Sequence, residues 1–313
     1  MNRAAAEPAS ETAQPIIFLG CQMKRMRAWL LLFLLLGFVA PTAIPAGEKD
    51  PVIYFGIIPR YNPMLMYRTY QPLMDYLTEH TPYRFELKLA RDYTEAVRLL
   101  REGVTPIASL GDVTFAEARQ LFGAVPVVKP LNAQGKDFYR SIIVVREDSP
   151  IRTLQDLRGK TFAFGDPHST SGNLIPRYFL FEHGITLFEF KEFVTLGSHD
   201  AVAKAVLKGR YDAGAVKDVI AHRYKEHGLR FLAESGPIPS VPIVVRRDAP
   251  SELVAAVRKA LLAIDGKDPG QRERMKDWDP EFRNGFTEAR EDDYLPIFRM
   301  MDGIRHGCGV KCH

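Results

Sequence analysis

Short β-rich runs alternate with helical patterns along most of this chain, and this alternation limits its fold more than any other feature. Val52–Ile58 is an apolar run bounded by Pro59, and the apolar residues between 70 and 77 that follow lie on one helical face. The same order, a strand pattern and then a helix pattern, recurs from Tyr83 to Leu110. Strands that alternate with helices form βαβ units, so the sequence predicts an α/β fold.

A second series of strands and helices follows the strand-like run Ser141–Arg146. Strands are expected at 161–164, 189–194 and 211–216, and helices at 170–182 and 200–208. Val241–Arg246 resembles the run at 141–146, and an amphipathic helix at 251–264 is expected to pack back on the first lobe. The chain would then cross between two βαβ lobes twice. Two crossings form a two-segment hinge, and a cleft between hinged lobes encloses a small ligand.

The 313 residues are enough for two lobes, each with its own core. The expected divisions are 47–140 for the first part of lobe 1, 141–242 for lobe 2, and 243–300 for the return segment of lobe 1. The remaining segments are 1–22, an unstructured extension or a misassigned start, 23–46, a signal peptide, and 301–313, a tail rich in Cys and His.

The segment 23–46 has the pattern of a secretory leader. Basic residues at 24, 25 and 27 precede an apolar run from Ala28 to Ala40, and a breaker-rich stretch then ends at Ala46. We expect cleavage after Ala46, with an uncleaved membrane anchor as the alternative. In either case the body of the protein is expected outside the cytoplasm, in the periplasm.

The overall composition is that of an ordinary globular protein, with 46% hydrophobic and 26% charged residues. A formal net charge of +4 argues against nucleic-acid binding. The sequence contains no phosphate loop, no His-Glu-x-x-His, no Gly-x-Ser-x-Gly and no dinucleotide fingerprint, so we expect no enzymatic activity. The carboxylates Asp277 and Asp279, and the pair Asp292 and Asp293, are expected to be solvated.

The segment most informative about chemistry is Gly165–Pro176, which follows an expected strand and opens an expected helix. Unpaired backbone amides and the helix dipole at such a start favour an oxyanion. Ser169, Thr170 and Ser171 would supply hydroxyl donors, and Gly172 would let the ligand approach the backbone. The alternative is that Ser169 is only an N-cap and the other residues form a turn.

The spelling Gly-Asp-Pro-x-Ser-Thr-Ser-Gly-x-Leu-x-Pro of that segment resembles the hallmark of the phosphate, phosphite and phosphonate substrate-binding proteins of ABC transporters. Further segments are similar in order and spacing: Phe55–Pro59, Pro72–Leu77, Ile107–Gly111, Tyr139–Ser141, Gly197–His199, Ala205–Gly209, Asp212–Val216 and Pro239–Val244. The resemblance implies the type II periplasmic binding-protein fold. It also implies a protein that binds a ligand without changing it.

The resemblance assigns roles to several residues. The Ser-Thr-Ser residues would hold the oxygens of a phosphonate or phosphate, and His199 would be a further ligand contact. Asp218 would accept a hydrogen bond from a hydroxyl or amine of the ligand, and its alternative is a surface or helix-cap aspartate. Tyr61 and Ser109 follow strands of the first lobe and are expected to face the same cleft.

Two departures from the family pattern bear on the ligand. Leu110 stands where aminoalkylphosphonate binders have an aromatic residue, and Val241 stands where they have an acid. The expected ligand is therefore phosphate, phosphite or a short alkylphosphonate. The expected function is that of the periplasmic solute-binding protein of an ABC importer, a monomer that delivers its ligand to a membrane permease. The alternatives are a ligand-sensing protein that acts with a membrane signalling partner and a periplasmic c-type haem protein that uses the C-terminal Cys and His residues.

The tail is not part of the family pattern. Cys308, Cys312 and His313 resemble a degraded c-type haem attachment site, with three residues between the cysteines instead of two. The other interpretations are a small local disulfide and the binding of a soft metal. Apart from this possible haem, no cofactor is expected.

Overall fold

The computed structural model describes residues 52–306, with side chains described to 303. The expected extension 1–22, the signal peptide 23–46 and the tail residues Cys308, Cys312 and His313 lie outside the described residues. Between 52 and 306, no helix is both long and apolar enough to cross a membrane.

One lobe is built on a six-stranded mixed sheet in the order β13-β4-β12-β3-β1-β2. The strands β1, β2 and β3 are parallel to one another, whereas β12 is antiparallel to both β3 and β4. The strands of this sheet are β1 (Val52–Ile57), β2 (Arg84–Leu89), β3 (Ile107–Ser109), β4 (Val125–Pro130), β12 (Ile243–Val245) and β13 (Phe286–Glu288).

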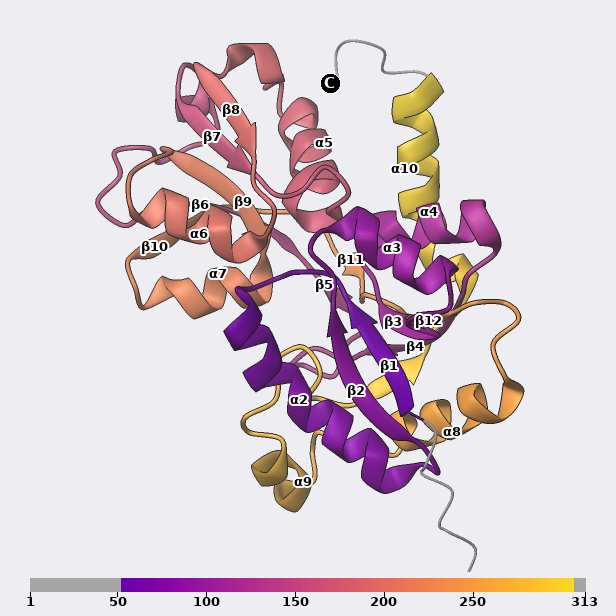
Figure 1. Cartoon of the computed structure of the whole chain (residues 1–313). Helices are drawn as coiled ribbons and strands as arrows, with labels where there is room; N and C mark the ends of the chain where they lie inside the picture. The colour runs from indigo at the N-terminus through magenta and orange to yellow at the C-terminus, as the bar shows by residue number, and fades with distance from the viewer. Residues whose placement is uncertain (1–51, 307–313) are drawn as a thin grey trace, which may run out of the picture. The chain divides into compact units, whose positions relative to one another are not determined.

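The first helix of this lobe begins at residues suited to starting a helix. The side chain of Asn62 caps it by accepting the backbone N–H of Leu65 at 3.1 Å, and Pro63 occupies the first helical position. The helices are α2 (Pro63–His80), α3 (Tyr93–Arg101), α4 (Asp112–Phe122), α8 (Ser251–Leu262), α9 (Pro269–Arg274), the short 3₁₀ turn η4 (Glu291–Tyr294) and α10 (Leu295–His306) (Figure 1).

The other lobe is built on a five-stranded mixed sheet in the order β10-β6-β9-β7-β8. Its strands are β6 (Ser141–Arg146), β7 (Thr161–Phe164), β8 (Glu192–Thr195), β9 (Ala213–Lys217) and β10 (Leu229–Glu234). Its helices and turns are η1 (Gln155–Leu157), η2 (Thr170–Leu174), α5 (Ile175–Glu182), η3 (Leu187–Glu189), α6 (His199–Leu207) and α7 (Asp218–Lys225).

Two short strands carry the chain between these sheets. β5 (Phe138–Tyr139) leads from β4 to β6, and β11 (Ile238–Pro239) leads from β10 back to β12. They pair antiparallel, so the two crossings run side by side between the lobes (Figure 1). The expected double crossing is confirmed. The exact boundaries of the lobes remain predictions.

Most expected strands and helices are present within a few residues of their predicted positions. The amphipathic helix expected at 251–264 is α8, which packs against α2 and β4 of the first lobe, as predicted. The helix expected at 170–182 does not start as an α-helix, because residues 170–174 form a π turn and the α-helix begins at Ile175.

Candidate functional site

The hydroxyl-rich turn after β7 is shaped by a proline and two glycines. Pro176 has no N–H to donate to the carbonyls of Gly172 or Ser171 in the preceding turn. Both carbonyls accept from other donors. The N–H of Gly165 donates to the carbonyl of Gly172 at 2.7 Å, and the hydroxyl of Ser141 donates to the carbonyl of Ser171 at 2.7 Å. The turn is thereby fixed onto the ends of β7 and β6.

Gly172 has no room for a side chain in this turn. An added Cβ would lie 2.8 Å from Oγ of Ser169 and 3.0 Å from Cε1 of His199. The expectation was that the bare backbone of Gly172 lets a ligand approach. In this structure protein atoms make that close approach, and the ligand role of Gly172 remains a prediction.

The three hydroxyl residues lie where the two lobes touch. Ser169, Thr170 and Ser171 are each only 2% exposed. Oγ1 of Thr170 accepts the backbone N–H of Val113 in α4, at 3.0 Å, across the lobe contact. Oγ of Ser169 accepts the N–H of Gly172 at 3.1 Å. The capping role weighed for Ser169 is therefore present, and the anion-binding role of the three residues remains a prediction.

His199 opens α6 directly beside this turn. Its Nδ1 accepts the backbone N–H of Lys217 at 3.2 Å, and its Nε2 lies 3.4 Å from Oγ of Ser169. Burial above all, with help from the nearby Lys217 and Arg60, lowers the pKa of His199 to about 3. The imidazole is thus neutral, and because Nδ1 accepts, the proton sits on Nε2. His199 therefore points an N–H donor towards the hydroxyl turn.

Two buried cations accompany the turn, and the sequence analysis did not identify either of them. Arg60 follows β1 and forms an ion pair with Glu281, and it also donates to the hydroxyls of Tyr70 at 3.0 Å and Ser109 at 3.2 Å. Lys217 ends β9, forms an ion pair with the same Glu281, and lies 3.9 Å from the ring centre of Tyr139. Both cations lie at the ends of strands, which is the one signal that could have suggested them.

Ionisable groups in the loop before β13 are also buried here. Burial would raise the pKa of Glu281, but Arg60 and Lys217 together hold it below its usual value. Asp279 is only 1% exposed, so the expectation that it is solvated was wrong. It is buried because its loop packs on α2, where its N–H donates to the carbonyl of Thr69 at 2.9 Å. Burial raises the pKa of Asp279 above its usual range.

The weaker first-lobe predictions, Tyr61 and Ser109, also lie in this region. Ser109 is fully buried at the end of β3 and accepts the guanidinium of Arg60. Tyr61 is buried, and the guanidinium of Arg223 in the other lobe lies 5.3 Å from its ring centre. Both residues are thus near the lobe contact, and their contact with a ligand remains a prediction.

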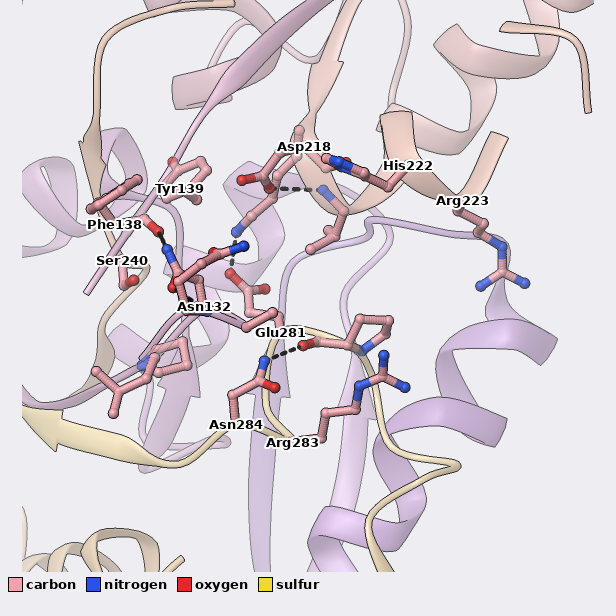
Figure 2. A pocket seen from close by; sticks show the side chains of 17 residues that line it. Asn132, Phe138, Tyr139, Asp218, His222, Arg223, Ser240, Glu281, Arg283 and Asn284 are labelled. Atoms are coloured by element: carbon pink, nitrogen blue, oxygen red, sulfur yellow. Dashed lines mark hydrogen bonds and ion pairs between the residues drawn. The ribbon is translucent and has the colours of Figure 1, made fainter. Parts of the chain in front are cut away.

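Asp218 lies at the wall of a pocket next to the buried ion pairs of Glu281 (Figure 2). Its carboxylate accepts the backbone N–H groups of Arg140 at 3.0 Å and Val219 at 2.7 Å. The pocket has a volume of about 500 Å³, and Tyr139, Lys217 and Glu281 form part of its wall. These three side chains connect the pocket to the buried ion pairs. Asp218 is placed to meet a group that enters there, although its ligand role is still a prediction.

No cluster of three or more His, Cys, Asp or Glu side chains suited to a metal ion occurs between residues 52 and 303. Together, the described groups form a buried polar cluster at the lobe contact, which we call the interlobe cluster. Asp112 also belongs to it, because its carboxyl accepts the hydroxyl of Tyr139. The members are Arg60, Ser109, Asp112, Tyr139, Ser141, Ser169, Thr170, Ser171, His199, Lys217 and Glu281.

Comparison with known proteins identifies the family. The sequence model of the family described as "ABC transporter, phosphonate, periplasmic substrate-binding protein" matches residues 55–294. The chain belongs to this family. The resemblance that the motifs suggested is therefore confirmed, and this family consists of binding components of transporters, not of enzymes.

Individual members of the family give the same result. The chain is 27% identical over 282 residues to the phosphonates-binding periplasmic protein of Escherichia coli (strain K12), covering 85% of this chain and 82% of that one. It is 27% identical over 296 residues to the phosphate-import protein PhnD of Mycolicibacterium smegmatis, covering 86% of this chain and 89% of that one.

A solved structure supports the fold. The binding-protein component of an ABC phosphonate transporter from Pseudomonas aeruginosa aligns with a TM-score of 0.72 at 26% identity, covering 80% of this chain and 86% of that one. The expected type II periplasmic binding-protein fold is confirmed, with two mixed sheets that form two lobes.

Proposed function

We propose that this family member captures phosphate, phosphite or a short alkylphosphonate at the interlobe cluster and presents it to an ABC permease. The observation that carries the proposal is the composition of the cluster. Two buried cations, Arg60 and Lys217, lie in the same cluster as a hydroxyl-rich helix start and the N–H donor of His199. These are the groups that hold a tetrahedral oxyanion in a dry site.

Glu281 supports this assignment because it shows which kind of group the two cations bind. In this structure its carboxylate oxygens accept from both Arg60 and Lys217, so a negatively charged acceptor already occupies the space between them. A ligand oxyanion can compete for the same donors. Arg60 and Glu281 belong to one lobe and Lys217 to the other, so a ligand held by both cations favours the arrangement in which the lobes touch.

The surroundings of the cluster indicate which substituents a ligand can carry. Leu110 and Val241, the two departures from the aminoalkylphosphonate pattern, are both buried and apolar. Neither can pair with an ammonium group. The pocket beside Asp218 nevertheless has room for a substituent, so the decisive test includes an aminoalkylphosphonate as well as the smaller anions.

The test is a ligand panel on the exported protein. The full chain is produced in a Gram-negative host and purified from the periplasmic fraction. An intact mass equal to that of a chain starting at Gly47 would support the proposed export and cleavage. After refolding to remove carried ligand, thermal unfolding is measured with phosphate, phosphite, methylphosphonate, 2-aminoethylphosphonate, arsenate and sulfate. At a hundred times its Kd, a ligand adds about 2.7 kcal/mol to the free energy of unfolding.

The double variant Ser169→Ala with Ser171→Ala is expected to lose this ligand-induced stabilisation. Loss of the Ser169 cap by itself lowers the basal stability by about 1 kcal/mol, so the measured quantity is the shift on ligand addition. Ser251→Ala, at an exposed serine in α8, is the matched control and keeps the full shift. An equal shift in the double variant would refute the hydroxyl site, and indifference of the wild type to every anion would refute the function.

A further inference from the structure

One carboxyl group of the interlobe cluster has an oxygen without a partner. Asp112 is the first residue of α4 and is fully buried. Its Oδ2 accepts the hydroxyl of Tyr139 at 3.3 Å, whereas its Oδ1 is buried and has no hydrogen-bond partner within the described part of the chain. A buried acceptor without a donor lowers the stability of the folded protein. We expect this oxygen to receive a hydrogen bond when a ligand is bound.

The position of this oxygen indicates which donor that is. The residue after Asp112 donates its N–H to Thr170, so the carboxyl lies beside the hydroxyl turn that would hold the oxyanion. Tyr139, which binds the other carboxyl oxygen, lines the adjacent pocket. A ligand held by Ser169 to Ser171 would therefore bring one of its own oxygens towards Asp112.

A charged ligand oxygen next to a charged Asp112 oxygen would be repelled unless a proton lies between the two. With one shared proton, the same contact becomes a short charge-assisted hydrogen bond. Burial, the largest influence, raises the pKa of Asp112 to about 7, so near neutral pH either partner can supply the proton. The charged and titratable groups that face this carboxyl are Arg60 after β1, Tyr139 in β5, Lys217 in β9, Glu281 before β13 and Tyr294 in η4.

We propose that Asp112 shares one proton with the bound oxyanion, so that the site selects its ligand by whether that proton is available. The inference rests on the proposed function and narrows the ligand class. Above neutral pH, Asp112 is ionised and accepts only a ligand that retains a hydroxyl group, which the phosphate dianion does. Sulfate and the dianions of phosphite and methylphosphonate have no such proton. Below neutral pH, Asp112 carries the proton and accepts them all.

The wild-type protein alone can test this. Calorimetric titrations with inorganic phosphate, phosphite, methylphosphonate and sulfate are compared at about pH 6 and about pH 8.5, on either side of the carboxyl pKa. We expect the three anions that have no hydroxyl at the higher pH to bind at least about tenfold more weakly there. The reason is that the protonated fraction of the Asp112 carboxyl falls about tenfold with each pH unit above its pKa. Phosphate should change less than about threefold by the same argument. A parallel loss for phosphate and phosphite, or no loss for either, overturns the proposal.

Asp112→Asn supplies a second measurement. The amide can donate to a fully deprotonated oxygen, so the ratio of phosphate to sulfate affinity at about pH 8.5 is expected to fall at least tenfold. Asp248→Asn, at an exposed aspartate paired with Arg246, is the matched control and keeps the wild-type ratio. Circular dichroism and the unfolding midpoint establish that each variant is folded. An unchanged ratio in folded Asp112→Asn contradicts the proposal, and if that variant does not fold, the wild-type comparison decides.

These outcomes separate the two proposals. If phosphate binds the wild type and depends on the Ser169 and Ser171 hydroxyls, but its advantage over sulfate and phosphite does not depend on Asp112 or on pH, proton sharing alone is refuted. If the wild type binds none of the four anions at either pH, the proposed function fails and this inference fails with it.

Discussion

At the scale of single residues, Glu281 is the side chain that most directly links stability to binding. Replacing it by glutamine leaves Arg60 and Lys217 buried without an anion, and breaking a buried pair in this way costs about 3–5 kcal/mol. An oxyanion ligand can replace the missing charge. We therefore expect Glu281→Gln to unfold at a lower temperature than the wild type and to gain more stability from saturating phosphate, as measured by thermal unfolding with and without ligand.

The pH dependence of the same pair has a definite sign. Since the folded pKa of Glu281 is lowered, the pair contributes fully above the unfolded glutamate value of about 4.3 and loses its contribution as the pH falls through the lower folded value. Glu281→Gln should remove this part of the acid sensitivity. Glu252→Gln, at an exposed position in α8, should leave both the acid sensitivity and the phosphate gain unchanged. A phosphate gain no larger than that of the wild type would show that Glu281 and the ligand do not compete.

At the scale of elements, the turn between β7 and α5 depends on backbone-to-backbone contact. A Cβ at Gly172 would lie within 3.1 Å of Ser169, His199 and the Cα of Gly165. Overpacking of this kind costs about 1–3 kcal/mol, and here it would displace the hydroxyl residues as well. We expect Gly172→Ala to lower the free energy of unfolding by that amount and to abolish phosphate binding in calorimetry. Gly236→Ala, where nothing lies within 4 Å, is the control, and wild-type affinity in Gly172→Ala would contradict this role.

The same elements show how far the sequence could be interpreted. Strands such as β1, β6 and β7 have local apolar patterns, so they were predicted nearly to the residue, and the hydroxyl turn was recognised from its spelling. The π turn was not foreseen, because it depends on carbonyl partners that Gly165 and Ser141 supply from other elements. The burial of Glu281 was missed because its partner Arg60 is 221 residues away in the chain.

At the scale of the whole molecule, binding is expected to appear as a change in how far apart the lobes are. In this structure the lobes touch through several polar contacts besides the shared ion pair. The N–H of Asp200 donates to the carbonyl of Arg60 at 3.2 Å, and His168 binds Glu117 at 2.8 Å. The His168–Glu117 contact lies at a partly exposed surface, where such a contact is worth about 0–1 kcal/mol, so it does not hold the lobes together permanently.

The two crossing strands, β5 and β11, are short enough to act as a hinge, and a ligand bound by both lobes shifts the equilibrium towards contact. We expect small-angle X-ray scattering to give a smaller radius of gyration with saturating phosphate than without ligand. The double variant Ser169→Ala with Ser171→Ala should show the ligand-free value in both conditions, because its lobes lose the shared ligand while the hinge is intact. An equal radius for the wild type with and without phosphate would mean that capture does not proceed by closure, since the ligand would then bind both arrangements equally well.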